Sequence, residues 1–142
     1  MTSVYELFET SESAVTDGIW CAIEHQGQEI CRIRVRSADR DLNPEIRKFM
    51  ATEAAKSVKE RGSLENVMDM LADPQMEHRL FAHAIVSDWE GITDQAGKAL
   101  KCTPKNVEKV LNDLPLLARQ IKAKAYSWTN FRKVFEQEAV GN

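Results

Sequence analysis

Residues 18–36 have the sequence GIWCAIEHQGQEICRIRVR, in which apolar and polar side chains alternate on both sides of the centre. Successive side chains of a strand point to opposite faces, so this alternation is typical of a strand with one buried face. The central residues His25-Gln26-Gly27-Gln28 separate the two halves as a turn does. The stretch predicts a β-hairpin whose buried side is formed by Ile19, Cys21, Ile23, Cys31, Ile33 and Val35.

Prolines mark where helices begin in the rest of the chain. Three of the four prolines follow a residue that can cap a helix, in the pairs Asn43-Pro44, Asp73-Pro74 and Thr103-Pro104. Proline is tolerated at the first helical position because its missing N–H has no partner there, and the preceding side-chain oxygen accepts a bond from a free backbone donor. We expect a helix to start at each pair.

Apolar residues at spacings of three, four and seven indicate how far the helices extend. Gly62 and Gly91 are natural stops, Ser63 is a cap for a short helix antiparallel to the one before it, and Pro115 forces a restart. Residues 91–103 are expected to form a loop or a short irregular hairpin. The expected helices cover residues 44–61, 63–71, 74–90, 104–114 and 115–140.

The fold class that follows is α+β, mainly α. An N-terminal β-hairpin or small antiparallel sheet precedes about five helices. The length of 142 residues fits a single domain, 1–142, with a hairpin region at 1–40 and a helical region at 43–140.

Composition and charge narrow the class of protein. The formal net charge is -3, so no strong positive field attracts nucleic acid, and nucleic acid is an unlikely partner. No secretory signal and no apolar run of the roughly 18 residues that a membrane span needs is present. The odd set Cys21, Cys31 and Cys102 fits reduced thiols. We expect a cytoplasmic protein without membrane association.

Residues that could bind a metal or catalyse a reaction are few. His25, His78 and His83 are scattered, and their spacing does not fit a zinc site, so we expect no metal and no cofactor. Asp88, Glu90 and Asp94 surround Trp89, but acidic residues at such positions are commonly just solvated. No GxSxG, HExxH or glycine-rich phosphate loop occurs. The chain is therefore not expected to be an enzyme.

Arg32, Arg34 and Arg36 alternate along the second strand, so they point to the face opposite its apolar side chains. One interpretation is a basic face that grips phosphates or an acidic partner. The other, of equal weight, is that long cationic side chains keep an exposed or edge strand from pairing with other chains.

Large aromatic residues near the C-terminus are the strongest candidates for a binding surface. Trp128, Phe131 and Phe135 lie on the last expected helix, and Trp89 is a further candidate. Such rings anchor protein interfaces, although a plain core-facing stripe is the more common arrangement.

Several short motifs follow one another in the second half of the chain. They are Val86-Ser87-Asp88-Trp89-Glu90-Gly91-Ile92-Thr93-Asp94, Gly97, Thr103-Pro104, Asn106-Val107 and Leu111-x-Asp113-x-Pro115. This order resembles the tail assembly chaperones of long-tailed phages, in which a D-W-x-G-[IV]-x-D segment precedes a T-P-x-N-V-x-x-[VL]-L helix. Leu7-Phe8-Glu9-Thr10 and Gly18-Ile19-Trp20 are also similar to the opening of the family.

The resemblance implies a phage or prophage protein without chemistry of its own. Such a chaperone binds the tape measure protein and keeps it soluble until the tail tube polymerises. The tail-tube protein is a further candidate partner, and self-association is expected. The protein would act in the host cytoplasm and be absent from the mature virion. The alternatives are a nucleic-acid-binding or regulatory module that uses Arg32, Arg34 and Arg36, and a structural tail or head-completion subunit.

Overall fold

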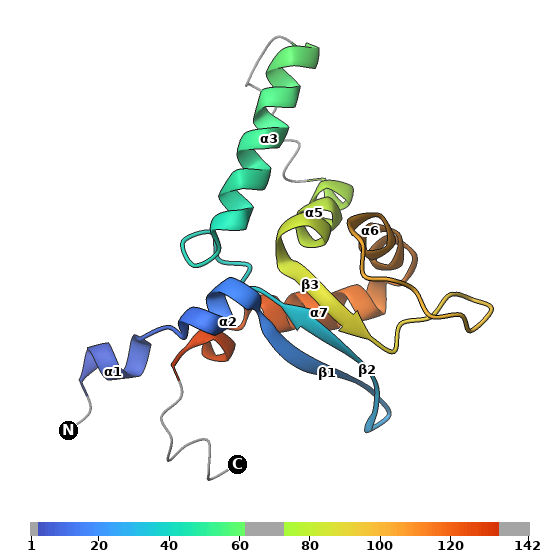
Figure 1. Cartoon of the computed structure of the whole chain (residues 1–142), viewed down its shortest axis with the longest axis horizontal. Coiled ribbons are helices and arrows are strands. Elements are labelled where there is room, and N and C mark those ends of the chain that lie inside the picture. Colours follow the sequence, from blue (N-terminus) through green and yellow to red (C-terminus); the bar gives the residue numbers. More distant parts are fainter. Residues whose placement is uncertain (1–2, 62–72, 134–142) are drawn as a thin grey trace.

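The β-hairpin forms at the predicted residues, with β1 covering Ile19–His25 and β2 covering Gln28–Val35 (Figure 1). The structure is a computed structural model that describes residues 3–61 and 73–133. Gln26 and Gly27 both have positive φ, 52° and 79°, as the primed turns of two-residue hairpins require. The predicted inner face is buried at Cys21, Ile23, Cys31, Ile33 and Val35, and Ile19 is half-buried.

A third strand, β3 (Val86–Glu90), pairs antiparallel with β2 and makes the sheet order β1-β2-β3. The prediction of one helix over residues 74–90 is therefore wrong. Helix α5 (Pro74–Leu80) continues only into a π-helical turn, η1 (Phe81–Ile85), before the strand starts.

A β-bulge explains why this strand has the apolar spacing of a helix. Arg34 pairs with Asp88 and Val35 pairs with Val86, which leaves Ser87 as an extra residue in β3. Val86 and Trp89 are three residues apart, a spacing that fits a helix face and not a regular strand. The bulge brings both side chains to the same buried face of the sheet.

The remaining long helices begin at the expected prolines. In each case the side-chain oxygen before the proline accepts a backbone N–H two or three residues further on. These capped helices are α3 (Pro44–Arg61), α5 and α6 (Pro104–Asp113). A further helix, α7 (Pro115–Tyr126), restarts the chain at Pro115, as predicted. The short helix expected over residues 63–71 lies outside the described residues.

Two short helices precede the hairpin and were not predicted. They are α1 (Val4–Phe8) and α2 (Glu12–Asp17). Ser3 and Ser11 cap them by accepting the backbone N–H of the residue three positions on.

The last helix is shorter than predicted. It ends at Tyr126, and a 3-10 turn, η2 (Trp128–Phe131), follows. The backbone oxygen of Phe131 accepts a hydrogen bond from Ser11 N at 2.9 Å, and Arg132 forms a β-bridge with Thr10. The chain turns back toward its N-terminal segment here. The prediction of a helix over residues 115–140 is therefore wrong for residues 127–133, the last ones that the structure describes.

One hydrophobic cluster joins the inner face of the sheet to the helices. Helix α7 packs against β1 and β2, and α6 packs against α7 and η1. In Figure 1, α7 lies behind the sheet, while no helix of the described residues crosses the centre of the opposite sheet face. The protein has an α+β fold that is mainly α, as predicted.

Candidate functional site

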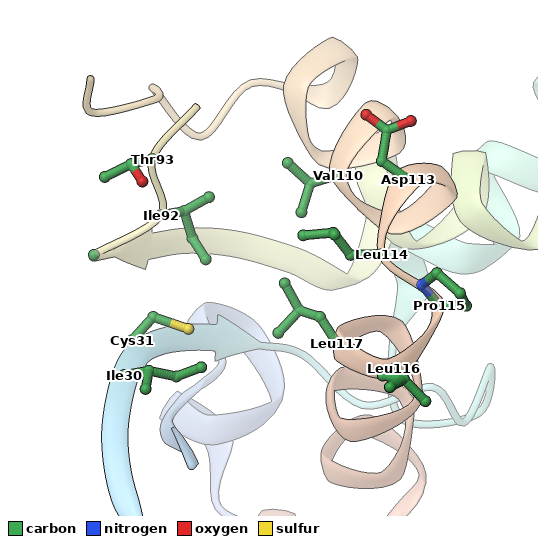
Figure 2. A pocket seen from close by; sticks show the side chains of 11 residues that line it. Ile30, Cys31, Ile92, Thr93, Val110, Asp113, Leu114, Pro115, Leu116 and Leu117 are labelled. Carbon is green, nitrogen blue, oxygen red and sulfur yellow. The ribbon is translucent and has the colours of Figure 1, made fainter. Parts of the chain in front are cut away.

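An open apolar groove lies between the ends of β2 and β3 and the corner where α6 meets α7 (Figure 2). Its volume is about 500 Å³. Its lining consists of Ile30, Cys31, Gly91, Ile92, Thr93, Val110, Asp113, Leu114, Pro115, Leu116 and Leu117. We call it the α6–α7 groove.

The strand side of the groove is shaped by a β-bulge in the hairpin. Ile23 pairs with Cys31 and Glu24 pairs with Glu29, so Ile30 is an extra residue in β2 without a partner on β1. Its side chain is 54% exposed at the rim of the groove. Gly91 continues the same wall with φ +82°, and a Cβ placed there would lie 3.3 Å from Cys31 Cα.

The helix side of the groove is shaped by the break between α6 and α7. Leu114 has φ -125° and ψ 77°, so it belongs to neither helix, and Pro115 starts the next one. Leu114 and Leu116 are 50% and 71% exposed, whereas Val110 is buried and Leu117 is partly buried beneath them. Two large apolar side chains therefore stand at the surface beside a covered apolar floor.

The chemistry of the groove is that of an apolar binding surface. Asp113 is the ionisable carboxylate among its lining residues, and Lys109 Nζ lies 2.7 Å from its Oδ2. Burial and, to a lesser degree, the charge of Glu29 raise the pKa of the Cys31 thiol, which keeps this group neutral. This lining can take up apolar side chains by burying them from water.

Two of the four aromatic residues that the sequence singled out are buried. Phe131 is completely buried and Trp89 is 7% exposed, with its Nε1 donating to the backbone oxygen of Leu100 at 2.8 Å. The expectation that these rings line a binding face is wrong for both, because they complete the core. The side chain of Trp128 and all of Phe135 lie outside the described residues.

Arg32 and Arg34 share one face of β2, as predicted, whereas Arg36 follows the last residue of the strand, and β2 is the central strand of the sheet. The second interpretation, an exposed or edge strand kept from pairing with other chains, is therefore wrong as far as it makes β2 an edge strand. Arg32 Nε donates to Glu29 at 2.6 Å, and Arg36 Nε donates to the backbone oxygen of Thr16 at 2.8 Å. The Nε of Arg34 is buried, and no residue within 3–61 and 73–133 accepts a hydrogen bond from it.

Acidic residues of β3 lie next to these arginines. In the register of the sheet, Arg32 is level with Glu90, and Arg34 is level with Asp88. The hydrogen bond and charge of Glu29, followed by the charge of Glu90, raise the pKa of Arg32. The basic row is thus locally balanced by carboxylates.

The other candidate polar residues have separate places. Asp94 accepts the backbone N–H groups of Ala96 and Lys98 and so shapes the 93–99 loop. His78 contacts Asn112, and the ring of His83 stacks on Phe49. Within residues 3–61 and 73–133, no three His, Cys, Asp or Glu side chains come together as a metal would require.

Sequence reasoning missed the residues that line the groove most openly. Ile30 directly precedes Cys31, so it is out of step with the buried residues of the strand, and the pairing of β1 with β2 leaves it as the extra residue of a bulge. Leu114, Leu116 and Leu117 crowd around Pro115, which gives this corner more apolar side chains than one helix face can bury. That excess is a signal that the sequence does contain.

A small, mainly helical α+β protein with an open apolar groove is the class that the fold and the site define. The model of the YdaY prophage protein family matches residues 27–142, and the chain belongs to this family. No curated protein and no solved structure matches the chain. Among the described residues, no helix is long and apolar enough to cross a membrane.

Proposed function

We propose that this prophage protein is a tail assembly chaperone that binds the tape measure protein and keeps it soluble until the tail tube polymerises. The observation that carries the proposal is the α6–α7 groove, with Ile30, Leu114 and Leu116 exposed around an apolar floor. Membership in a family of prophage proteins supports the phage context. The motif resemblance at residues 86–115 supports the assignment to tail assembly.

The groove suits a helical client for a physical reason. An amphipathic helix presents apolar side chains at spacings of three, four and seven, and such a ridge is buried efficiently in an apolar groove. Exposed leucines on the receiving side exclude water from that contact and provide moderate, reversible affinity. A chaperone that must release its client needs this kind of contact.

The rest of the proposed role follows from the same binding step. The chain needs no catalysis and no cofactor to hold a client. It acts in the host cytoplasm, is absent from the mature virion, and contacts the tail-tube protein when the client is released.

Serine substitutions at the groove test the proposal. The double variant Leu114→Ser with Leu116→Ser removes two exposed apolar side chains, so the fold should tolerate it. Co-expression with the tape measure protein of the same prophage should then yield less soluble client. The affinity for a purified client segment should fall roughly tenfold, equivalent to about 1.4 kcal/mol.

The matched control is Val4→Ser with Tyr5→Ser on α1, where the two side chains are 67% and 88% exposed and lie outside the groove. This control should leave client solubility unchanged. Equal client recovery with the groove variant and the wild type would refute the proposed site. Detection of the protein in purified virions would instead support a structural tail or head-completion subunit.

The nucleic-acid alternative is less favoured by the geometry. Arg32 is paired with Glu29, Arg36 is bound to a backbone oxygen, and the carboxylates of Asp88 and Glu90 lie beside the row. Phosphates approaching this face meet negative charge as well as positive charge.

A further inference from the structure

One face of the sheet is left uncovered by the helices that the structure describes, and its charges are arranged in two parallel rows. We call it the open sheet face and define it by Trp20 and Ala22 of β1, Arg32 and Arg34 of β2, and Asp88 and Glu90 of β3. These side chains point away from the buried residues of the same strands, because neighbours on a strand alternate. Helix α7 packs on the other side of the sheet (Figure 1).

We propose that the open sheet face is a self-complementary interface through which two copies of this chain pair around a two-fold axis. The inference does not depend on the proposed chaperone function. It rests on the charge pattern and on the exposed Trp20.

The two charge rows fit a second copy when the two-fold axis lies above the open sheet face, runs parallel to the strands and is midway between β2 and β3. Rotation about this axis places β2 of one copy over β3 of the other without changing the level along the strands. Arg32 then faces the partner's Glu90, and Arg34 faces the partner's Asp88, because these residues are already level in the sheet. The contact is made twice, as an isologous interface requires.

The arginines are available for such a contact, and Asp88, whose Oδ1 accepts the backbone N–H of Trp89 at 2.8 Å, has further lone pairs for a guanidinium. The pair between Arg32 and Glu29 is exposed at both ends, with side chains 55% and 44% accessible, so exchanging it for another carboxylate costs little. Arg34 Nε is buried with no acceptor in the part of the chain that the structure describes, and the guanidinium carries further N–H donors at its tip. A carboxylate of the partner can accept from that tip in bidentate geometry.

Trp20 adds the apolar part of the interface. It is 40% exposed and lies beside Arg34 in the register of the sheet. With the axis described, Trp20 flanks the partner's β3, where its ring excludes water from the charge pairs. Tryptophan and arginine are the residues most enriched at the energetic centres of interfaces.

The size of the face sets the expected strength. Two strands of about five residues cover roughly 17 Å by 10 Å, which is below the area of a standard stable interface. We therefore expect a weak dimer that forms at high protein concentration. Because its contacts are largely ionic, salt should weaken it further.

Charge reversal with mixing tests the interface. Sedimentation equilibrium of the full chain over roughly 10–500 µM should show a concentration-dependent dimer whose affinity falls when salt is raised to about 1 M. The variants R32E/R34E and D88R/E90R should each lose dimerisation, with dissociation constants raised at least about tenfold, since like charges then face each other. An equimolar mixture of the two should restore a dimer at least as strong as the wild type.

The control variant K98E/K105E reverses two exposed lysines outside the face and makes the same change in net charge as R32E/R34E. It should dimerise like the wild type. Circular dichroism checks folding, and the single-pair variants R32E and E90R, mixed in the same way, serve if a double variant unfolds. Restoration only in the mixture supports the interface.

Three outcomes would overturn the inference. The first is a wild type that stays monomeric throughout the concentration range. The second is a mixture of folded variants that fails to restore the dimer. The third is a monomeric wild type that binds duplex DNA in a salt-sensitive way and loses this binding in R32E/R34E, which would assign the face to nucleic acid.

Discussion

Phe131 offers the sharpest test of whether the C-terminal aromatics belong to the core. The sequence favoured it as part of a client surface, whereas the structure buries its side chain completely at the end of η2. Truncation of a fully buried phenylalanine to alanine costs about 3–5 kcal/mol, because transfer energy is lost and a cavity remains. Phe131→Ala should therefore lower the free energy of unfolding by that amount.

The expected thermal effect follows from the chain length. For a chain of 142 residues, each 1 kcal/mol corresponds to about 3 °C, so the Tm should fall by about 9–15 °C. Urea denaturation at 25 °C, followed by far-UV circular dichroism, measures the loss directly through a lower midpoint at an unchanged slope. Leu116→Ala is the matched control, since this side chain is 71% exposed and its loss should change stability by about 0.5 kcal/mol or less.

A loss of less than about 1 kcal/mol for Phe131→Ala, with an unchanged slope, would refute the core assignment. It would return this ring to the list of surface candidates. It would also question the turn that brings residues 131–133 against the N-terminal segment.

Two further predictions concern buried polar groups. The Nδ2 of the fully buried Asn43 donates to the backbone oxygens of Ser37 and Ala84, each at 2.9 Å, and Asn43→Ala removes both hydrogen bonds. The substitution should lower the free energy of unfolding, measured by urea denaturation, by about 2–4 kcal/mol. A loss below about 1 kcal/mol would contradict this role. Burial raises the pKa of the Cys102 thiol from 9.0 to about 11, so the folded state favours the neutral thiol, and this stabilisation is complete below pH 9.0 and lost as pH rises through about 11. The free energy of unfolding should fall over that window, with Tyr126, whose pKa is raised chiefly by burial, contributing in the same direction. Cys102→Ala should flatten part of the slope, and an identical slope in the variant would exclude the thiol as its cause.

The proposed site was the least predictable part of the molecule. The aromatic residues chosen from the sequence have the composition of an interface, but Phe131 and Trp89 are the side chains that the core needs to exclude water. The exposed residues Ile30 and Leu114 lie at a bulge and at a helix break, two irregularities that come from pairing and packing. Composition indicates how much apolar surface exists, whereas packing decides which part of it stays in contact with solvent.

The sequence by itself determined the features that depend on neighbouring residues. The hairpin follows from two-residue alternation around Gly27, and the starts of α3, α5 and α6 follow from a capping side chain before a proline. These preferences act within one turn of backbone, so a linear pattern contains them.

Only the tertiary structure decided the features that depend on distant residues. The free side of β2 takes residues 86–90 as a third strand, and the bulge at Ser87 lets a helix-like spacing bury Val86 and Trp89 together. Likewise, Phe131 enters the core because residues 131–133 bond to the N-terminal segment. Hydrogen bonding between segments far apart in sequence outweighs local periodicity here. Leaving the backbone of β2 unpaired or an aromatic ring exposed to water costs more free energy than ending a helix early.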